Sequence, residues 1–178
     1  MRADPPFAIV LAAALAAAMT LLFLLPGCGG AKGQTKGEVT PATLAGPPKP
    51  WEEMEHKEKA EYMRDHVVPV MKPLFVAFDA TEYAEFGCKT CHGPDARERE
   101  FQMPNPHNEV LYPTGSPEQL RTVAEHPEAV RFMVNEVVPT MQALLGIEPY
   151  DEVRGTGFSC FYCHPAGQVT APVVVPGG

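Results

Sequence analysis

Apolar side chains recur at the spacing of one helix face through the second half of the chain. The stripe consists of Val130, Met133, Val134, Val137, Val138, Met141, Leu144 and Leu145. Ser116 followed by Pro117 is typical of a helix start, and Pro127 restarts the helix. Gly146 is suited to end it. The pattern therefore predicts helices that begin near residues 116 and 127, the second of which ends near residue 145.

A second amphipathic stretch lies in the first half. Residues 52–65 are dominated by acidic and basic side chains, which is typical of a solvated helix face, and Pro50 predicts the start of that helix. The helix is predicted to continue through Tyr62 and the apolar positions that follow it. Pro69 and Pro73 are predicted to kink it or to break it into turns.

The two stretches are copies of one unit. Met63, Val67, Val68, Pro69, Met71 and Leu74 recur at an offset of 70 as Met133, Val137, Val138, Pro139, Met141 and Leu144. Phe86 and Cys88 recur as Phe158 and Cys160 at an offset of 72, so the second connecting loop is two residues longer. Because repeats of one supersecondary unit usually pack together, we expect a mainly α fold. Its two half-modules, about 50–95 and 116–165, would be related by a pseudo-two-fold axis and joined by long irregular loops.

The first 50 residues differ from the rest. Residues 7–25 carry no charge, and the string Leu25-Pro26-Gly27-Cys28 follows them. This resembles a bacterial lipoprotein signal, which implies a signal peptide over 1–27 and a lipidated Cys28. Gly29 and Gly30 follow Cys28 with no aspartate, which by the same resemblance favours the outer membrane as the location. An uncleaved membrane anchor is the alternative, since the apolar run is just long enough to span. Residues 28–49 read as a flexible tether, and 167–178 as an extended or disordered tail.

Composition narrows the functional classes. Twenty prolines, fifteen glycines and nine phenylalanines in 178 residues give a thin apolar core. The net charge is −8, which speaks against a nucleic-acid partner, because phosphate binding needs a basic face. The same acidic balance favours a positively charged redox partner.

The cysteines carry the chemistry. Four of the five lie in two C-x-x-C-H strings, Cys88–His92 and Cys160–His164, and the fifth is Cys28. This string is the attachment signature of a c-type haem, in which two thiols bind the porphyrin and the histidine binds the iron. Zinc and simple disulfides remain as alternatives. Zinc knuckles normally lie closer together, and disulfides leave the histidines unexplained. We expect two haem c groups within a cytochrome domain spanning 50–166.

The order of helix, loop and C-x-x-C-H resembles the cytochrome subunit of photosynthetic reaction centres and its shorter relatives. The match covers about residues 60–165, with two haem units where the reaction-centre subunit has four. In that family a helical methionine is the sixth iron ligand, which points to Met71 and Met141. A thioether favours Fe(II); core packing is the alternative role for both residues. Met63 and Met133 are the second choice.

Two six-coordinate haems would make the chain an electron carrier on the periplasmic side of a membrane, tethered through Cys28 and exchanging electrons with donor and acceptor proteins. The alternatives are a small haem enzyme, a peroxidase or reductase with one open iron, and a gas sensor. An enzyme would need a distal acid–base group, for which His66 or Glu136 is available. His56, His107 and His126 are interpreted as surface residues.

Overall fold

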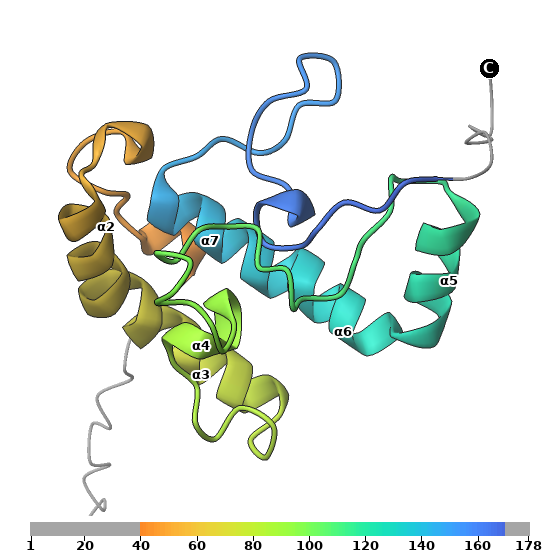
Figure 1. Ribbon diagram of the computed structural model, residues 1–178, viewed down its shortest axis with the longest axis horizontal. Helices are drawn as coiled ribbons and strands as arrows, with labels where there is room; N and C mark the ends of the chain where they lie inside the picture. Colours follow the sequence, from red (N-terminus) through yellow and green to blue (C-terminus); the bar gives the residue numbers. More distant parts are fainter. Residues whose placement is uncertain (1–39, 170–178) are drawn as a thin grey trace, which may run out of the picture. The chain divides into compact units, whose positions relative to one another are not determined.

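The computed structural model describes residues 40–169, and this part of the chain is mainly helical with no β-strand. The mainly α class is therefore confirmed. Figure 1 shows two long helical runs. The elements in chain order are η1 (Pro41–Thr43), η2 (Trp51–Glu53), α2 (His56–Tyr62), η3 (Met63–Val67), α3 (Val68–Phe78), α4 (Cys88–His92), α5 (Pro117–Glu125), α6 (Pro127–Phe132), η4 (Met133–Val137), α7 (Val138–Leu145) and η5 (Cys160–Tyr162).

The starts of α5 and α6 and the end of α7 follow the predicted signals. The Ser116 hydroxyl accepts a hydrogen bond from the Gln119 N–H at 3.1 Å, and Pro117 occupies the first turn. Pro127 begins α6. Gly146 ends α7 in the left-handed region, with φ 63°. Each signal works because it satisfies or removes a backbone group that a helix end leaves unpaired.

Both long helices contain a π-helical segment at the same place in the repeat. η3 and η4 each precede a proline by one residue, Pro69 and Pro139, and the Val68 and Val138 N–H groups bond five residues back, to Met63 and Met133. A proline lacks an N–H and its ring collides with the carbonyl four residues earlier. The wider π turn relieves that collision. The helix predicted to kink or break at its prolines therefore continues as α3 to residue 78.

The two long helices pack antiparallel with reciprocal contacts. The Tyr62 hydroxyl donates to the Leu144 carbonyl at 2.7 Å, at the far end of α7. Phe132, the repeat counterpart of Tyr62, packs against Phe75 and Phe78 at the far end of α3, with ring centroids 5.1 and 4.3 Å apart. The buried core formed around these contacts consists of Met54, Tyr62, Val67, Met71, Phe75, Phe86, Phe132 and Leu144.

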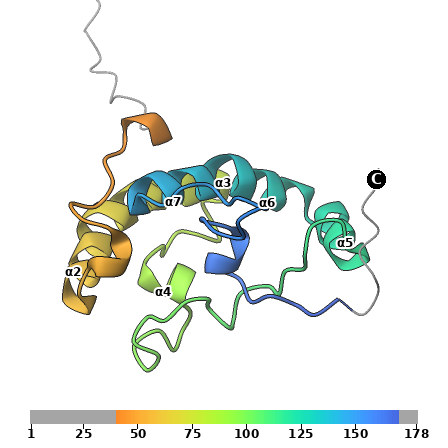
Figure 2. The same cartoon turned by 90° about the horizontal axis from the view of Figure 1, so that it is seen from above.

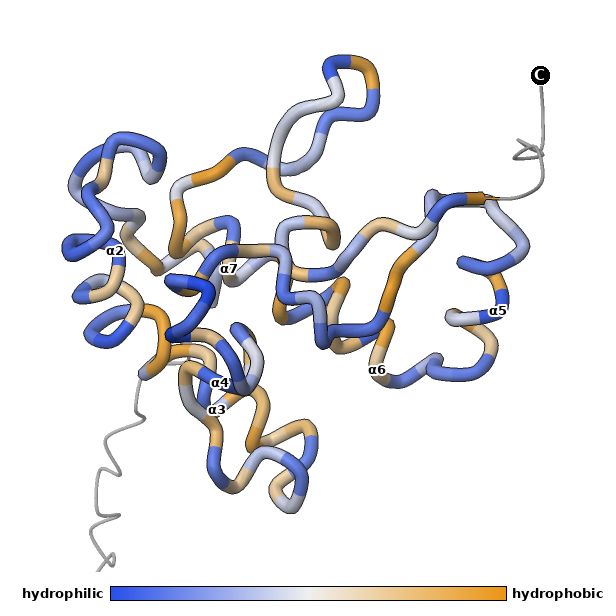
Figure 3. Tube along the Cα trace, viewed as in Figure 1, coloured by the Kyte–Doolittle hydropathy of each residue, from blue (hydrophilic) through white to orange (hydrophobic). Residues whose placement is uncertain are grey.

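Polarity changes along the first long helical run. Figure 3 shows the change from mainly hydrophilic residues along α2 to mainly hydrophobic residues along α3.

Figure 2 shows α4 and η5 on the same side of helices α3, α6 and α7. Within residues 40–169, no helix combines the length and the apolar character needed to cross a membrane.

The N-terminal boundary differs from the sequence prediction. The tether was predicted to run to residue 49, yet Leu44 packs against the core and the Ala45 carbonyl accepts from the Tyr62 hydroxyl at 3.3 Å. Pro50 starts a short 3₁₀ turn, and α2 begins only at His56, because the intervening Met54 is turned into the core. The predicted signal peptide, Cys28 and residues 170–178 lie outside the described residues.

Candidate haem-binding site

The first C-x-x-C-H string forms a single helical turn, α4. The Gly87 N–H donates to the Thr90 hydroxyl at 3.0 Å before the turn, and the Gly93 N–H donates to the Lys89 carbonyl at 2.9 Å after it. Gly93 has φ 86°, a conformation that favours glycine. The turn therefore presents Cys88, Cys91 and His92 from one compact element, as attachment to one ring edge requires.

The second string forms a shorter turn. Only Cys160–Tyr162 is helical, as the 3₁₀ turn η5, and the Ser159 hydroxyl accepts from the Phe161 N–H at 3.3 Å. The two strings differ in the residue that follows them. His164 precedes Pro165, which disfavours a helical conformation for the histidine, whereas His92 precedes Gly93.

The four thiols are free within the described part of the chain. Burial, together with the neighbouring Cys163 and Cys88, raises the pKa of Cys91 to about 12. Burial, together with the neighbouring Cys160, raises the pKa of Cys163 to about 11. Hydrogen bonds from Asn105 to the Cys91 and Cys163 carbonyls bring the two strings together, although 68 residues separate Cys91 from Cys160 in the sequence.

Both motif histidines are oriented in the same way. Nδ1 of His92 lies 3.1 Å from the Phe101 carbonyl oxygen, and Nδ1 of His164 lies 2.9 Å from that of Glu109. Because a carbonyl can only accept, each Nδ1 must carry the proton, which leaves Nε2 with a lone pair for a metal. Burial, the main cause, lowers the pKa of His92 and so also favours its neutral form. His92 and His164 could therefore each bind a haem iron through Nε2.

The loop between α4 and α5 connects the two strings. The Asn105 side chain donates to the Cys91 carbonyl at 3.1 Å, while its backbone N–H donates to the Cys163 carbonyl at 3.2 Å. The Asn108 side chain donates to the same Cys163 oxygen at 2.8 Å. Arg99 donates to the His92 carbonyl. Farther along, Leu111 pairs with residues 165–167 in a parallel bridge.

The repeated methionines lie in or against one core. Met71 is 2% exposed, and Met63, Met133 and Met141 are partly buried and pack against the same cluster, as does Cys91. The structure thus brings the four repeated methionines to the core beside the first C-x-x-C-H turn, which suits either ligation or core packing.

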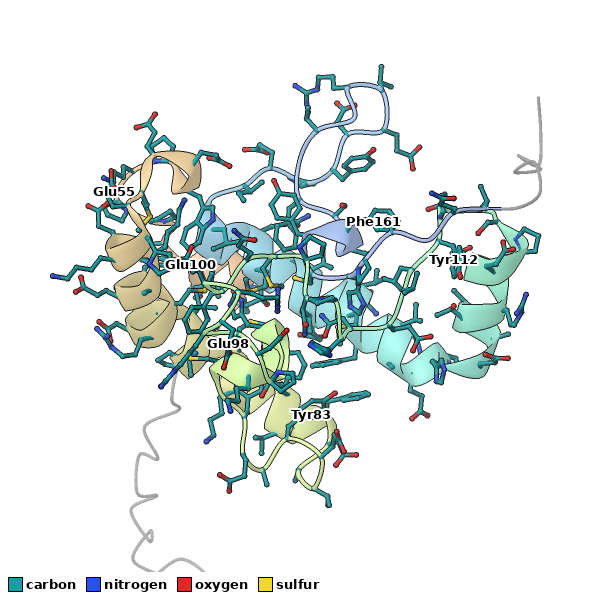
Figure 4. All side chains as sticks on the ribbon, in the orientation of Figure 1. Glu55, Tyr83, Glu98, Glu100, Tyr112 and Phe161 are labelled. Atoms are coloured by element: carbon teal, nitrogen blue, oxygen red, sulfur yellow. The ribbon has the colours of Figure 1, made fainter. Side chains whose placement is uncertain are left out.

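Five aromatic residues lie in or near the two C-x-x-C-H strings and differ in burial. Phe86 and Phe158 are buried, and Phe158 stacks on Tyr162 with centroids 4.7 Å apart. Tyr83 packs edge-on against Phe75 in the core. Phe161 and Tyr162 are 37% and 38% exposed. Figure 4 shows Phe161 on the η5 turn and Tyr83 on the loop between α3 and α4.

The residues considered for acid–base chemistry lie on the π segments. His66 and Glu136 are both exposed, and the His66 ring stacks on Tyr62 at 4.7 Å. His56 and His126 are exposed, and His107 lies 3.1 Å from Asp95 as a charge partner. Within residues 40–169, no group of three or more His, Cys, Asp or Glu side chains is arranged to hold a metal ion.

Sequence reasoning missed Arg99, Asn105 and Asn108, because residues 96–115 read as loop by composition. The available signal was two asparagines three residues apart in a loop that must return the chain to the second string. Comparison with known proteins adds nothing to the assignment: no family model, curated protein or solved structure matches this chain.

Proposed function

We propose that this chain is a dihaem c-type cytochrome that transfers electrons outside the cytoplasm. One observation carries the proposal. Each C-x-x-C-H turn presents a histidine whose Nδ1–H is bound to a backbone carbonyl, Phe101 for His92 and Glu109 for His164. Two equivalent histidines oriented in this way, each beside two free thiols, match what covalent haem requires.

The roles of the residues follow from the two turns. Cys88 and Cys91 would hold one haem and Cys160 and Cys163 the other. Met71 and Met141 are the proposed sixth ligands, in the pseudo-two-fold arrangement that the reciprocal helix contacts support. A haem iron with two protein ligands supplies one-electron redox chemistry and leaves no coordination site for substrate. The resemblance to the reaction-centre cytochrome subunit supports the same assignment.

Membrane attachment is proposed through lipidation of Cys28, with donor and acceptor proteins as partners. The net charge of −8 favours a partner with a basic docking face. Residues 29–39 would then connect the anchor to a haem domain whose first packed residues include Leu44.

The proposal is tested by producing the chain in a bacterium that attaches haem covalently and measuring haem per chain after denaturation. We expect two haems in the unaltered protein. A Cys88→Ala, Cys91→Ala double variant and a Cys160→Ala, Cys163→Ala double variant should each keep one. An absence of covalent haem in the unaltered protein would refute the proposal.

Carbon monoxide distinguishes the electron carrier from the alternatives. Two six-coordinate haems should leave the reduced spectrum unchanged on exposure to carbon monoxide. Ready binding by the native protein would instead indicate an open iron, and thus a small haem enzyme or a gas sensor. A Cys28→Ser variant is expected to keep both haems and to lose the mass of the attached lipid in mass spectrometry.

A further inference from the structure

Asn105 is a polar side chain in an unusual place. It is 2% exposed, and it lies in the loop between the two C-x-x-C-H turns. Burying a polar side chain is costly unless its hydrogen-bonding groups find partners. Its amide donates to the Cys91 carbonyl at 3.1 Å and to the Asn108 side-chain oxygen at 2.8 Å. Its own Oδ1 accepts from the His107 N–H at 3.0 Å.

The same residue also bonds the second turn. The Asn105 backbone N–H donates to the Cys163 carbonyl at 3.2 Å, and the Asn108 side chain donates to that oxygen as well. The carbonyl of Cys91 belongs to the peptide that leads into His92, and the carbonyl of Cys163 to the peptide that leads into His164. One buried residue therefore bonds the two peptides that carry the two candidate iron ligands.

The space around Asn105 allows little movement. A Cβ atom added at Gly93 would lie 2.6 Å from the Asn105 Oδ1, so the turn after the first string closes directly on this side chain. The Arg99 guanidinium, 3.5 Å from the same oxygen, also donates to the His92 carbonyl. Buried networks whose members are all bonded are rigid and specify one arrangement.

We propose that Asn105 is a positioning residue that fixes the separation and relative orientation of the two haems. The inference rests on the proposed function, because it concerns haems attached at Cys88–His92 and Cys160–His164. Asn105 would act through the two peptides that it bonds, not as an iron ligand. A change at this position should alter the coupling between the haems and leave the ligands of each haem in place.

The test uses the circular dichroism of the Soret band. Two haems held close together give paired positive and negative bands, whose amplitude depends on their distance and mutual angle. Asn105→Asp keeps the size and the Oδ1 acceptor but loses both amide donor bonds. We expect it to lose at least half of that amplitude, with two haems per chain and an unchanged absorption spectrum. Asn135→Asp, on the exposed face of η4, makes the same chemical change and should keep the full amplitude.

The outcomes separate this inference from the proposed function. Two haems per chain without paired bands in the unaltered protein would overturn the positioning role and leave the cytochrome assignment standing. Full amplitude in Asn105→Asp with two haems bound would also overturn it. If that variant fails to bind haem, Asn108→Ala decides: it removes one bond to the Cys163 carbonyl and one to Asn105. A reduced amplitude with two haems then supports the inference, and an unchanged one overturns it.

Discussion

A glycine-to-alanine variant at Gly93, compared with two reference variants, tests the packing after the first C-x-x-C-H turn. Gly93 has φ 86° and ψ 172°, a region almost restricted to glycine, so that an alanine there costs about 1–3 kcal/mol in backbone strain. The new Cβ would lie 2.6 Å from the Asn105 Oδ1 and 3.0 Å from the His107 Cδ2. Overpacking of this kind adds about 1–3 kcal/mol. We therefore expect Gly93→Ala to lower the free energy of unfolding by about 2–6 kcal/mol.

Two other glycines serve as references that separate the cost of backbone strain from the cost of overpacking. Gly155 has φ 65° and nothing within 4 Å of an added Cβ, so Gly155→Ala should cost only the strain of a left-handed residue, about 1–2 kcal/mol. Gly87 is extended, with φ −170° and equally open space. Gly87→Ala should leave stability unchanged or raise it by about 0.4–1 kcal/mol, because the unfolded chain loses freedom.

The assay is chemical denaturation of the haem-loaded proteins, followed by far-ultraviolet circular dichroism. Haem content is measured first, so that proteins with equal loading are compared. The predicted order of destabilisation is Gly93→Ala, then Gly155→Ala, then Gly87→Ala. A Gly93→Ala protein that is no less stable than Gly155→Ala would refute the close packing of Asn105 against the first turn.

Three further predictions concern the core and the loop. Tyr62→Phe should lower the free energy of unfolding by about 1–3 kcal/mol in denaturation, because it leaves the buried Leu144 carbonyl without its donor; no loss would refute that bond. Met71→Ala should lower the free energy of unfolding by about 2–5 kcal/mol, and Met141→Ala by less, because Met71 is more deeply buried. Each variant should also lose a methionine–iron charge-transfer band. Native spectra in both variants would exclude ligation by these residues. Hydrogen bonds from His107 and, to a smaller extent, Arg99 lower the pKa of Asp95 in the folded protein. The stability that Asp95 contributes is therefore present above its pKa in the unfolded chain and is lost as the pH falls through its pKa in the folded protein. The stability difference from Asp95→Asn should therefore vanish in acid; a constant difference would refute the pairing.

The local signals in the sequence predicted helix ends well. Ser116, Pro127 and Gly146 each act on backbone groups within one turn, so neighbouring residues suffice to predict them. The apolar spacing within each stretch predicted the two long helices, because it also depends only on residues a few positions apart. The start at Pro50 was wrong, because whether a turn continues as a helix depended on burial of Met54 in a core that local sequence does not show.

The connections between distant segments were beyond sequence reasoning. The role of Asn105 depends on the Cys91 and Cys163 carbonyls, which lie 14 and 58 residues away in sequence. Loop composition carries no information about such pairings. Likewise, Leu44 and Ala45 read as tether because few apolar residues surround them, yet they pack on the core and on Tyr62. The orientation of each motif histidine by a backbone carbonyl also required the folded loop.

The π segments η3 and η4 determine the direction in which every later side chain of their helices points around the helix axis. In an α-helix each residue advances the side-chain direction by about 100°. Deleting one residue from Met63–Val67 would restore α-helical spacing before Pro69 and rotate Met71 by about that angle, out of the core that now buries it. The same holds for Met133–Val137 and Met141. A one-residue change of length in either π segment would therefore displace every side chain that follows it in the helix, whereas a substitution changes the contacts of one residue.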